Sequence, residues 1–143
     1  MKITTIATEE DLQAAFDIRK KVFVEEQHVP LEDEFDEFDT LTAPCKHILV
    51  AADNQIAGTG RIRWVDGVGK LERICILPEF RSLGLGKEIV LALEKIAQEE
   101  KTASVKLHGQ THAEKFYQKL GYETASPVFM EDGIAHLIMT KTL

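Results

Sequence analysis

The sequence predicts a mixed α/β sandwich built around one central sheet. Two observations lead to this fold class. Three strand patterns in the middle of the chain are joined by short turns, and the second half alternates helix and strand patterns. The 143 residues contain no internal repeat and no Gly/Ser linker, so we expect one domain over residues 1–143.

The N-terminal part predicts a short strand followed by a helix. Residues 3–6 form the strand pattern, and Thr8, which precedes three acidic residues, is a typical helix N-cap. The helix is expected to run to about Glu25, with apolar residues at spacings of three and four facing the core. Arg19 falls near that apolar face, where it either extends to solvent or serves a site.

An acidic segment follows the helix, from Leu31 to Asp39. It contains six carboxylates, with Phe35 and Phe38 between them. Two interpretations remain open, a solvated loop pinned by the two phenylalanines or a site for a cation or an amine. The charge of the segment also suggests a cationic substrate.

Three strands are predicted next, in an antiparallel meander. Residues 47–52 and 56–65 flank an Asp53-Asn54 turn, and Asp66-Gly67 is a strong hairpin signal before a strand over residues 70–77.

The second half begins with the most regular helix pattern of the chain. Apolar residues repeat at helical spacing from Gly84 to about Gln98. A strand over residues 103–107 follows, and then a short helix with Thr111 as its N-cap and Gly121 as its left-handed stop. Further strands close the chain.

Composition and charge argue against several classes of protein. The 17 basic and 24 acidic residues give a net charge of −7, which disfavours nonspecific attraction to nucleic acid or anionic membrane. No signal-peptide pattern or membrane-spanning apolar run occurs, so we expect a cytoplasmic protein. Cys45 and Cys75 fall in different elements without metal-ligand spacing, so we expect free thiols, with Cys75 in the core, and no metal.

The residues that indicate chemistry lie where the last meander strand leads through a glycine loop into the long helix. Gly84 and Gly86 let the backbone approach a ligand closely, and the helix start offers unpaired N–H groups and a positive dipole end. Arg81 and Lys87 flank the loop and add positive charge. This pattern favours a pyrophosphate-binding loop, with an ordinary flexible helix start as the alternative. A dinucleotide fingerprint would need a third glycine where Glu88 stands.

Two motifs, in the right order, resemble the GNAT superfamily of N-acyltransferases. The run Arg81 to Gly86 after an apolar strand resembles the acyl-CoA signature of that family, and Phe116 to Tyr122 is similar to its later helix. The resemblance covers essentially the whole chain, and residues 19–27 and 133–136 are similar to the small bacterial YjcF/ElaA-type subgroup. It implies a central mixed, mostly antiparallel, splayed sheet with helices on both faces.

The resemblance also implies an activity. It suggests an N-acetyltransferase that moves an acetyl group from acetyl-CoA to a primary amine of a small molecule or peptide by direct transfer. A homodimer is implied by analogy. Carried over from the family motifs, the cofactor contacts fall on Ile74, Cys75, Ile76, Arg81, Ser82, Leu83, Gly84, Leu85, Gly86, Lys87, Gln110 and Phe116. Many relatives carry Asn on the strand before the Phe-Tyr helix, where this chain leaves His108 or Gln110 to meet the pantetheine arm.

Two side chains are candidates for proton transfer. Tyr117 would donate a proton to the departing CoA thiolate, although a core tyrosine is the alternative. Glu72 would take a proton from the acceptor ammonium, directly or through water, although an ion pair with Arg73 or Lys70 on an exposed strand face is the alternative.

The acceptor end is less specified by the sequence. Phe23, Gln27 and Arg73 are expected there from the resemblance. Three histidines lie near the site, but none has metal spacing and none is assigned a catalytic role; they are His108, His112 and His136. Two other functions stay open, a non-catalytic acyl-CoA-binding sensor module and an unrelated α/β scaffold that binds no CoA.

Overall fold

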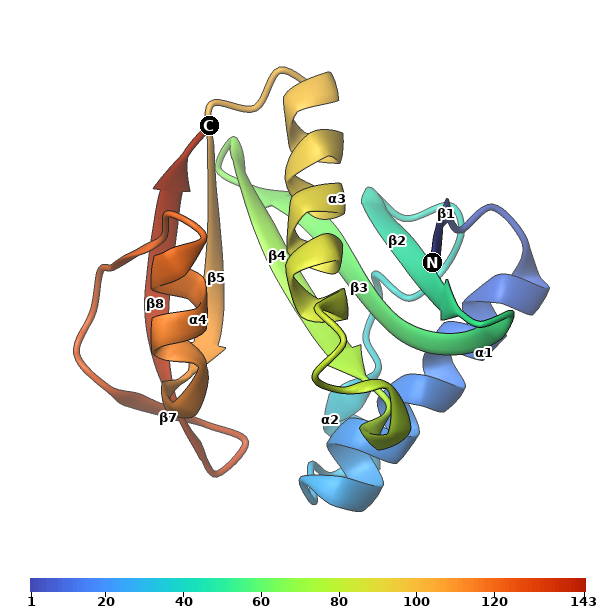
Figure 1. Cartoon of the computed structure of the whole chain (residues 1–143). Helices are drawn as coiled ribbons and strands as arrows, with labels where there is room; N and C mark the ends of the chain where they lie inside the picture. Colours follow the sequence, from blue (N-terminus) through green and yellow to red (C-terminus); the bar gives the residue numbers. More distant parts are fainter.

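The chain folds around one eight-stranded sheet, seen in the computed structural model of residues 1–143 (Figure 1). The strands lie in the order β1-β2-β3-β4-β5-β8-β6, and β7 also pairs with β8. Every paired neighbour is antiparallel except β4 with β5, so the mixed, mostly antiparallel sheet is confirmed. The strands are β1 (Lys2–Thr5), β2 (Cys45–Ala52), β3 (Gln55–Val65), β4 (Val68–Ile76), β5 (Ser104–Gln110), β6 (Glu123–Thr124), β7 (Phe129–Glu131) and β8 (Ile134–Thr142).

Helices cover both faces of the sheet. In Figure 1, α3 and α4 lie on the face toward the viewer, and α1 and α2 lie at the opposite side, below the β2–β3 end. The helices are α1 (Glu9–Arg19), a π-helix (Lys20–Glu26), α2 (Leu31–Glu34), a 3-10 turn (Pro78–Phe80), α3 (Leu85–Glu99), a 3-10 turn (Thr111–Ala113) and α4 (Glu114–Lys119). None of them is long and apolar enough to cross a membrane.

The core is divided between the two faces because side chains alternate along each strand. On β2, Ile48 and Val50 join the large cluster beneath α3, while Leu49 between them joins a smaller cluster with α1. Cys75 of β4 belongs to the smaller cluster. Both cysteines are free thiols and Cys75 is buried, as the sequence predicts, and Cys45 is buried as well.

Local signals agree with the structure in most places. The Thr8 side chain accepts a hydrogen bond from the Asp11 amide at 3.2 Å, which confirms the predicted N-cap. The hairpin residues Asp66 and Gly67 both have positive φ, as a tight two-residue turn requires. Gly121 follows α4 with φ 98, which confirms the left-handed stop.

Two local predictions are wrong. The first helix does not stay α-helical to Glu25, because the backbone changes to π geometry at Lys20. Thr111 does not cap the short helix. It begins a 3-10 turn instead, and α4 starts at Glu114 without a side-chain cap. A 3-10 turn brings the next donor groups within reach of backbone carbonyls, so no side-chain acceptor is needed there.

The sheet opens between β4 and β5. Their parallel pairing is limited to three positions, Gly69 to Leu71 on β4. Beyond them β4 has a bulge, because Arg73 and Ile74 together oppose Gly60 of β3 and Arg73 adopts φ 58. A bulge bends and twists its strand, so the C-terminal half of β4 diverges from β5 (Figure 1). The splayed sheet that the resemblance implies is therefore present.

Candidate active site

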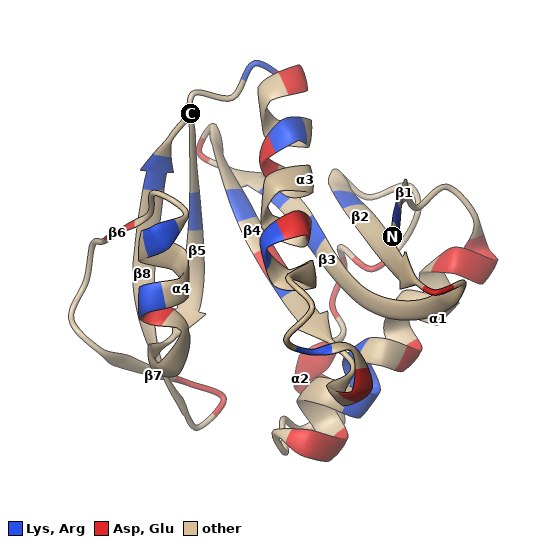
Figure 2. Cartoon of the chain, in the orientation of Figure 1, with Lys and Arg blue, Asp and Glu red and all other residues tan.

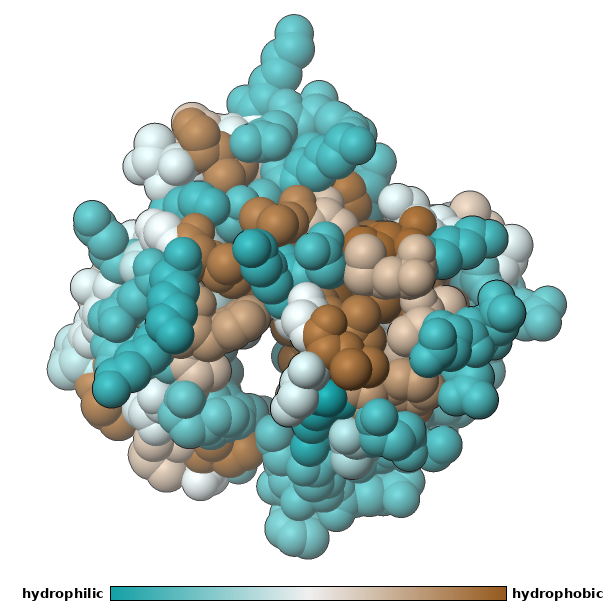
Figure 3. Space-filling view, viewed as in Figure 1, coloured by the Kyte–Doolittle hydropathy of each residue, from teal (hydrophilic) through white to brown (hydrophobic).

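A cleft of about 610 Å³ occupies the opening between β4 and β5. Figure 3 views it from the α3 and α4 side, where apolar side chains gather around the hollow. The structure brings to its walls the following predicted residues: Phe23, Gln27, Glu72, Arg73, Ile74, Cys75, Ile76, Arg81, Gln110 and Tyr117. The other predicted cofactor residues lie outside the lining, in the glycine loop and on the helices beside it: Ser82, Leu83, Gly84, Leu85, Gly86, Lys87 and Phe116.

The glycine loop leads directly from the cleft to the start of α3. Gly84 has φ 79 and forms the N-cap of α3, and a side chain built on it would meet nothing within 4 Å. The backbone at Gly84 therefore leaves room for a ligand to approach closely. Gly86 lies against Phe116, whose ring would be 3.3 Å from a Cβ at this position. The two sequence motifs thus meet in space.

Arg81 joins the loop to the cleft and is held by two partners. Its Nε donates to the Ile76 carbonyl at 3.0 Å, and its two terminal nitrogens donate to the Glu26 carboxylate at 2.8 and 2.7 Å. The hydrogen bond from Arg81 lowers the pKa of Glu26 below its usual value. Both side chains are exposed, so this pair is open to exchange with another anion.

The C-terminal half of β4 forms one wall of the cleft. Beyond Leu71, β4 no longer pairs with β5. The backbone groups along this edge of β4 are therefore available to a ligand. Ile74 and Ile76 pack toward the α3 core, whereas Cys75 is buried on the α1 side. Burial raises the pKa of the Cys75 thiol, so the thiol is not a nucleophile at neutral pH.

Tyr117 lies at the opposite wall, on α4. Its ring packs against Phe116 and Tyr122 and would touch a Cβ at Gly109 of β5 at 3.2 Å. Burial raises the pKa of its phenol to about 12. The phenol is therefore protonated at neutral pH, the form needed in a proton donor.

Glu72 also lines the cleft but is surrounded by cations. Its carboxylate pairs with Arg61, Arg63 and Lys70 at 3.0, 2.8 and 2.9 Å. Burial alone would raise the pKa of Glu72, but the hydrogen bonds from Arg63 and Lys70 and the charge of Arg61 outweigh it and lower the pKa to about 2. A carboxylate with so low a pKa accepts a proton poorly at neutral pH.

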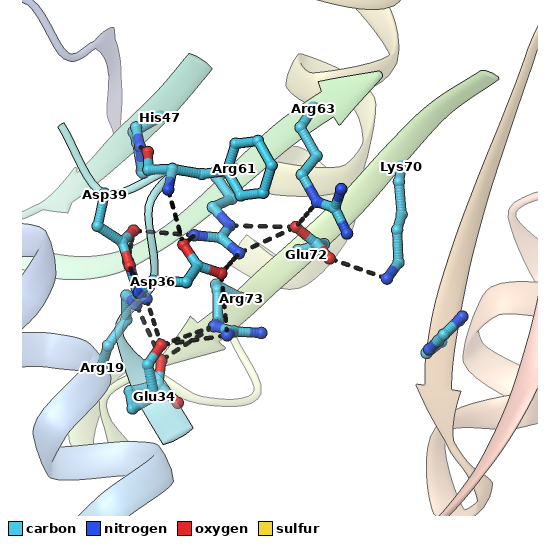
Figure 4. Close-up of polar contacts among 12 residues, drawn as sticks. Arg19, Glu34, Asp36, Asp39, His47, Arg61, Arg63, Lys70, Glu72 and Arg73 are labelled. Atoms are coloured by element: carbon cyan, nitrogen blue, oxygen red, sulfur yellow. Dashed lines mark hydrogen bonds and ion pairs between the residues drawn. The ribbon is translucent and has the colours of Figure 1, made fainter. Parts of the chain in front are cut away.

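Glu72 is one end of a buried ion network that crosses β3 and β4 (Figure 4). Arg19, only 1% exposed, pairs with Glu34 at 2.9 Å and with Asp39 at 2.6 Å. Arg61, equally buried, links the same Asp39 to Asp36 and Glu72. Each of these ion pairs is also a hydrogen bond. No buried side-chain nitrogen or oxygen of the chain lacks a hydrogen-bond partner.

The acidic segment matches the solvated-loop interpretation only in part. Glu32, Asp33 and Glu37 are exposed. The other three carboxylates turn inward to arginines that lie 15 or more positions away in sequence. The segment is not open to a cationic ligand through those carboxylates, because they are already paired. Likewise Arg19 does not extend to solvent. It neutralises the buried segment.

The residues expected at the acceptor end lie on the cleft wall opposite α3. The guanidinium of Arg73 donates to the Glu34 carbonyl and lies 3.2 Å from the Glu34 carboxylate. The Gln27 side chain accepts a hydrogen bond from the Gln110 amide at 2.9 Å, which spans the cleft from the π-helix to β5. Phe23 lines the wall beside Gln27.

One pair of site residues was not predicted as such. His108 of β5 hydrogen-bonds Glu131 of β7 through Nδ1 at 2.9 Å, and both line the cleft. The Phe129 ring lies edge-on to His108 and stacked with His136, which holds the two imidazoles beside Glu131. The only sequence signal was the number of histidines near the site, because the pairing depends on the register of β8 with β5 and β7.

Known proteins are similar to this chain in sequence and in fold over nearly their full length. The sequence profile of the acetyltransferase (GNAT) domain matches residues 6–143. YyaT, an uncharacterized Bacillus subtilis protein, is 59% identical over 100% of this chain and 97% of its own length. YjcF, an uncharacterized N-acetyltransferase of Bacillus subtilis, is 44% identical over 99% of both chains. The crystal structure of a Pseudomonas aeruginosa acyl-CoA N-acyltransferase matches with a TM-score of 0.87 and 26% identity, covering 99% of each chain.

Proposed function

Because the chain belongs to the GNAT acetyltransferase family, we propose that it transfers an acetyl group from acetyl-CoA directly to a primary amine of a small molecule or peptide. The observation that carries the proposal is the continuity of three features. The unpaired edge of β4 and Tyr117 line one cleft, and the open glycine loop leads from that cleft to the start of α3. When bound, acetyl-CoA supplies the thioester whose acetyl group the acceptor nitrogen receives.

The residues present fit a long ligand with a pyrophosphate. The amides at the start of α3 and the positive end of its dipole suit an anion, and Gly84 leaves room for it. Arg81 can exchange Glu26 for a phosphate, and Lys87 lies exposed in the first turn of α3. The β4 edge from Ile74 to Ile76 would then pair with the amide groups of the pantetheine arm.

Tyr117 and the strand edge divide the remaining work. A backbone N–H of the open β4 edge can polarise a carbonyl, because such donors are fixed before the reaction begins. Tyr117 holds a proton at its phenol oxygen and would deliver it to the leaving sulfur. In this proposal Phe23, Gln27 and Arg73 shape the acceptor side of the cleft. Glu72 contributes its negative charge to the cleft and does not act as the base.

Calorimetric titration with acetyl-CoA tests the cofactor site. We expect micromolar binding, about −8 kcal/mol, and at least a tenfold weaker affinity in Gly84→Asp, because a carboxylate would face the phosphates. Gly67→Asp is the matched control, since Gly67 also has positive φ and open surroundings but lies in the β3–β4 turn. Absence of heat with the unsubstituted chain contradicts the proposal.

Transfer is tested separately from binding. Release of free CoA thiol from acetyl-CoA with a panel of primary amines should exceed release without amine. Tyr117→Phe should bind acetyl-CoA with unchanged affinity and turn over at least tenfold more slowly. If the chain binds acetyl-CoA and no amine accelerates thiol release, the sensor function is favoured instead.

A further inference from the structure

We propose that His108, oriented by Glu131, accepts the proton of the acceptor ammonium, and that the acceptor is a cationic amine which binds beside the β7–β8 turn. The inference rests on the proposed acetyl transfer and assigns a catalytic residue and a substrate class to its acceptor side. Four observations support it: the charge balance of the cleft, the surroundings of Glu72, the hydrogen bond between His108 and Glu131 and the packing around the His108 ring.

The charge balance favours a cation. Each Lys or Arg on the cleft wall is already paired with a glutamate, Lys70 with Glu72, Arg73 with Glu34 and Arg81 with Glu26. The two acids left over are Glu131, whose ion partners are histidines, and Asp132, which forms no ion pair. Figure 2 shows acidic residues on the turn that follows β7, at the end where β4 and β5 diverge. An anionic acceptor would find no unpaired cation beside this turn.

Glu72, the carboxylate on the β4 wall of the cleft, is poorly suited to the proton-transfer step. Its three cationic neighbours stabilise the ionised form, and they would repel an incoming ammonium. An imidazole avoids both problems, because its neutral form accepts a proton near neutral pH. Among the histidines of the cleft, His112 bonds to Gln110 at the exposed rim and His136 is buried. His108 is 24% exposed.

The hydrogen bond to Glu131 fixes the tautomer of His108. The bond from His108 lowers the pKa of Glu131, so its carboxylate is ionised and can only accept. Nδ1 of His108 must therefore carry the hydrogen, and the lone pair of the neutral ring lies on Nε2, which has no protein partner. A carboxylate that holds a histidine in this way also stabilises the imidazolium after the proton arrives.

The packing around the ring restricts its orientation. Phe129 meets it edge-on at 5.2 Å, and the same phenylalanine stacks on His136. His136 donates from Nδ1 to the Ile134 carbonyl at 2.7 Å, so its own position is fixed by the chain. The His108 ring is thus held by Phe129, which is in turn held by His136.

The step is a single proton transfer. One N–H bond of the acceptor ammonium breaks, its electron pair stays on nitrogen, and the proton bonds to Nε2 of His108. The charged or titratable groups around this part of the cleft are Glu131, Asp132, His136, Lys70 and Glu72. The neutral amine then has the lone pair that acyl transfer requires, and His108 returns the proton to solvent.

Two amines of equal length test the proposal once the unsubstituted chain shows transfer. Ethylamine is protonated at mildly alkaline pH, whereas 2,2,2-trifluoroethylamine is neutral there. His108→Asn keeps a donor toward Glu131 but has no base, so kcat/KM should fall about a hundredfold for ethylamine and less than about threefold for the fluorinated amine. His28→Asn, an exposed histidine outside the cleft, is the control.

An equal fall for both amines would overturn the proposal, because it would show a structural role. If neither amine is transferred, nitrogen NMR of the imidazoles decides. In the labelled protein, His108 should show the Nδ1–H tautomer at neutral pH and should lose it in Glu131→Gln. A dominant Nε2–H tautomer in the unsubstituted protein would overturn the assignment, whatever the outcome of the CoA titration.

Discussion

The β4 wall and the β7 wall of the cleft each present a glutamate, and the two glutamates have different surroundings. Glu72 on β4 meets three cations and is 8% exposed, whereas Glu131 on β7 meets imidazoles and is 43% exposed. The first carboxylate is locked into a network that reaches Arg19 on α1 (Figure 4). The second has one close partner, which can itself gain or lose a proton.

This difference separates stability from reactivity within one cleft. A buried ion network that is fully hydrogen-bonded holds its strands in one arrangement, but its carboxylates are unavailable as bases. A half-exposed Glu–His pair contributes little to stability and leaves a titratable nitrogen beside the substrate space. The β4 wall would therefore hold the shape of the cleft, and the β7 wall would react.

Removal of Arg61 should give the largest effect on stability. Arg61→Met leaves Asp36, Asp39 and Glu72 without their shared cation, and breaking a buried pair in this way costs about 3–5 kcal/mol. Urea unfolding measures the loss. Lys46→Met is the matched control, because the Lys46–Glu100 pair is half exposed and should contribute less than about 1 kcal/mol. Equal losses in the two variants would contradict a structural role for the network.

The pH dependence of stability should show the state of Glu72. Its folded pKa of about 2 lies below the usual value of 4.5, so its contribution is fully present above about pH 4.5 and is lost as the pH falls toward 2. That contribution is about 3 kcal/mol at most. Glu72→Gln should therefore flatten the acid side of the stability profile, measured by urea unfolding at several pH values. An unchanged slope would show that the cations do not hold Glu72 ionised.

Much of the fold follows from local sequence patterns. The alternation of apolar residues predicts the strands, helical spacing predicts α3, and the Asp66-Gly67 pair predicts the β3–β4 turn. The glycine loop and the Phe-Tyr helix were also recognisable, because each motif is contiguous in sequence. Their contact through Gly86 and Phe116 explains why both motifs occur in one chain.

The acceptor side could not be predicted in the same way. The inward turn of Asp36 and Asp39 depends on arginines 20 or more positions away, which a local pattern cannot pair. The change to π geometry at Lys20 has no residue signature, since the same residues also form α-helices. The His108–Glu131 pair depends on strand register, and a shift of one residue would turn either side chain to the other face.

The smallest expected effect on stability is that of Glu131→Gln. Glu131 is 43% exposed and its ion partners are histidines, so its loss should change the free energy of unfolding by less than about 1 kcal/mol, well below the change in Glu72→Gln. Turnover, unlike stability, should fall strongly in Glu131→Gln. Without the carboxylate, His108 loses its fixed tautomer, so kcat/KM for a protonated amine should fall tenfold or more. Parallel urea unfolding and transfer assays on both variants measure the contrast. If Glu131→Gln proves as destabilising as Glu72→Gln while transfer is unchanged, the roles of the two walls are reversed.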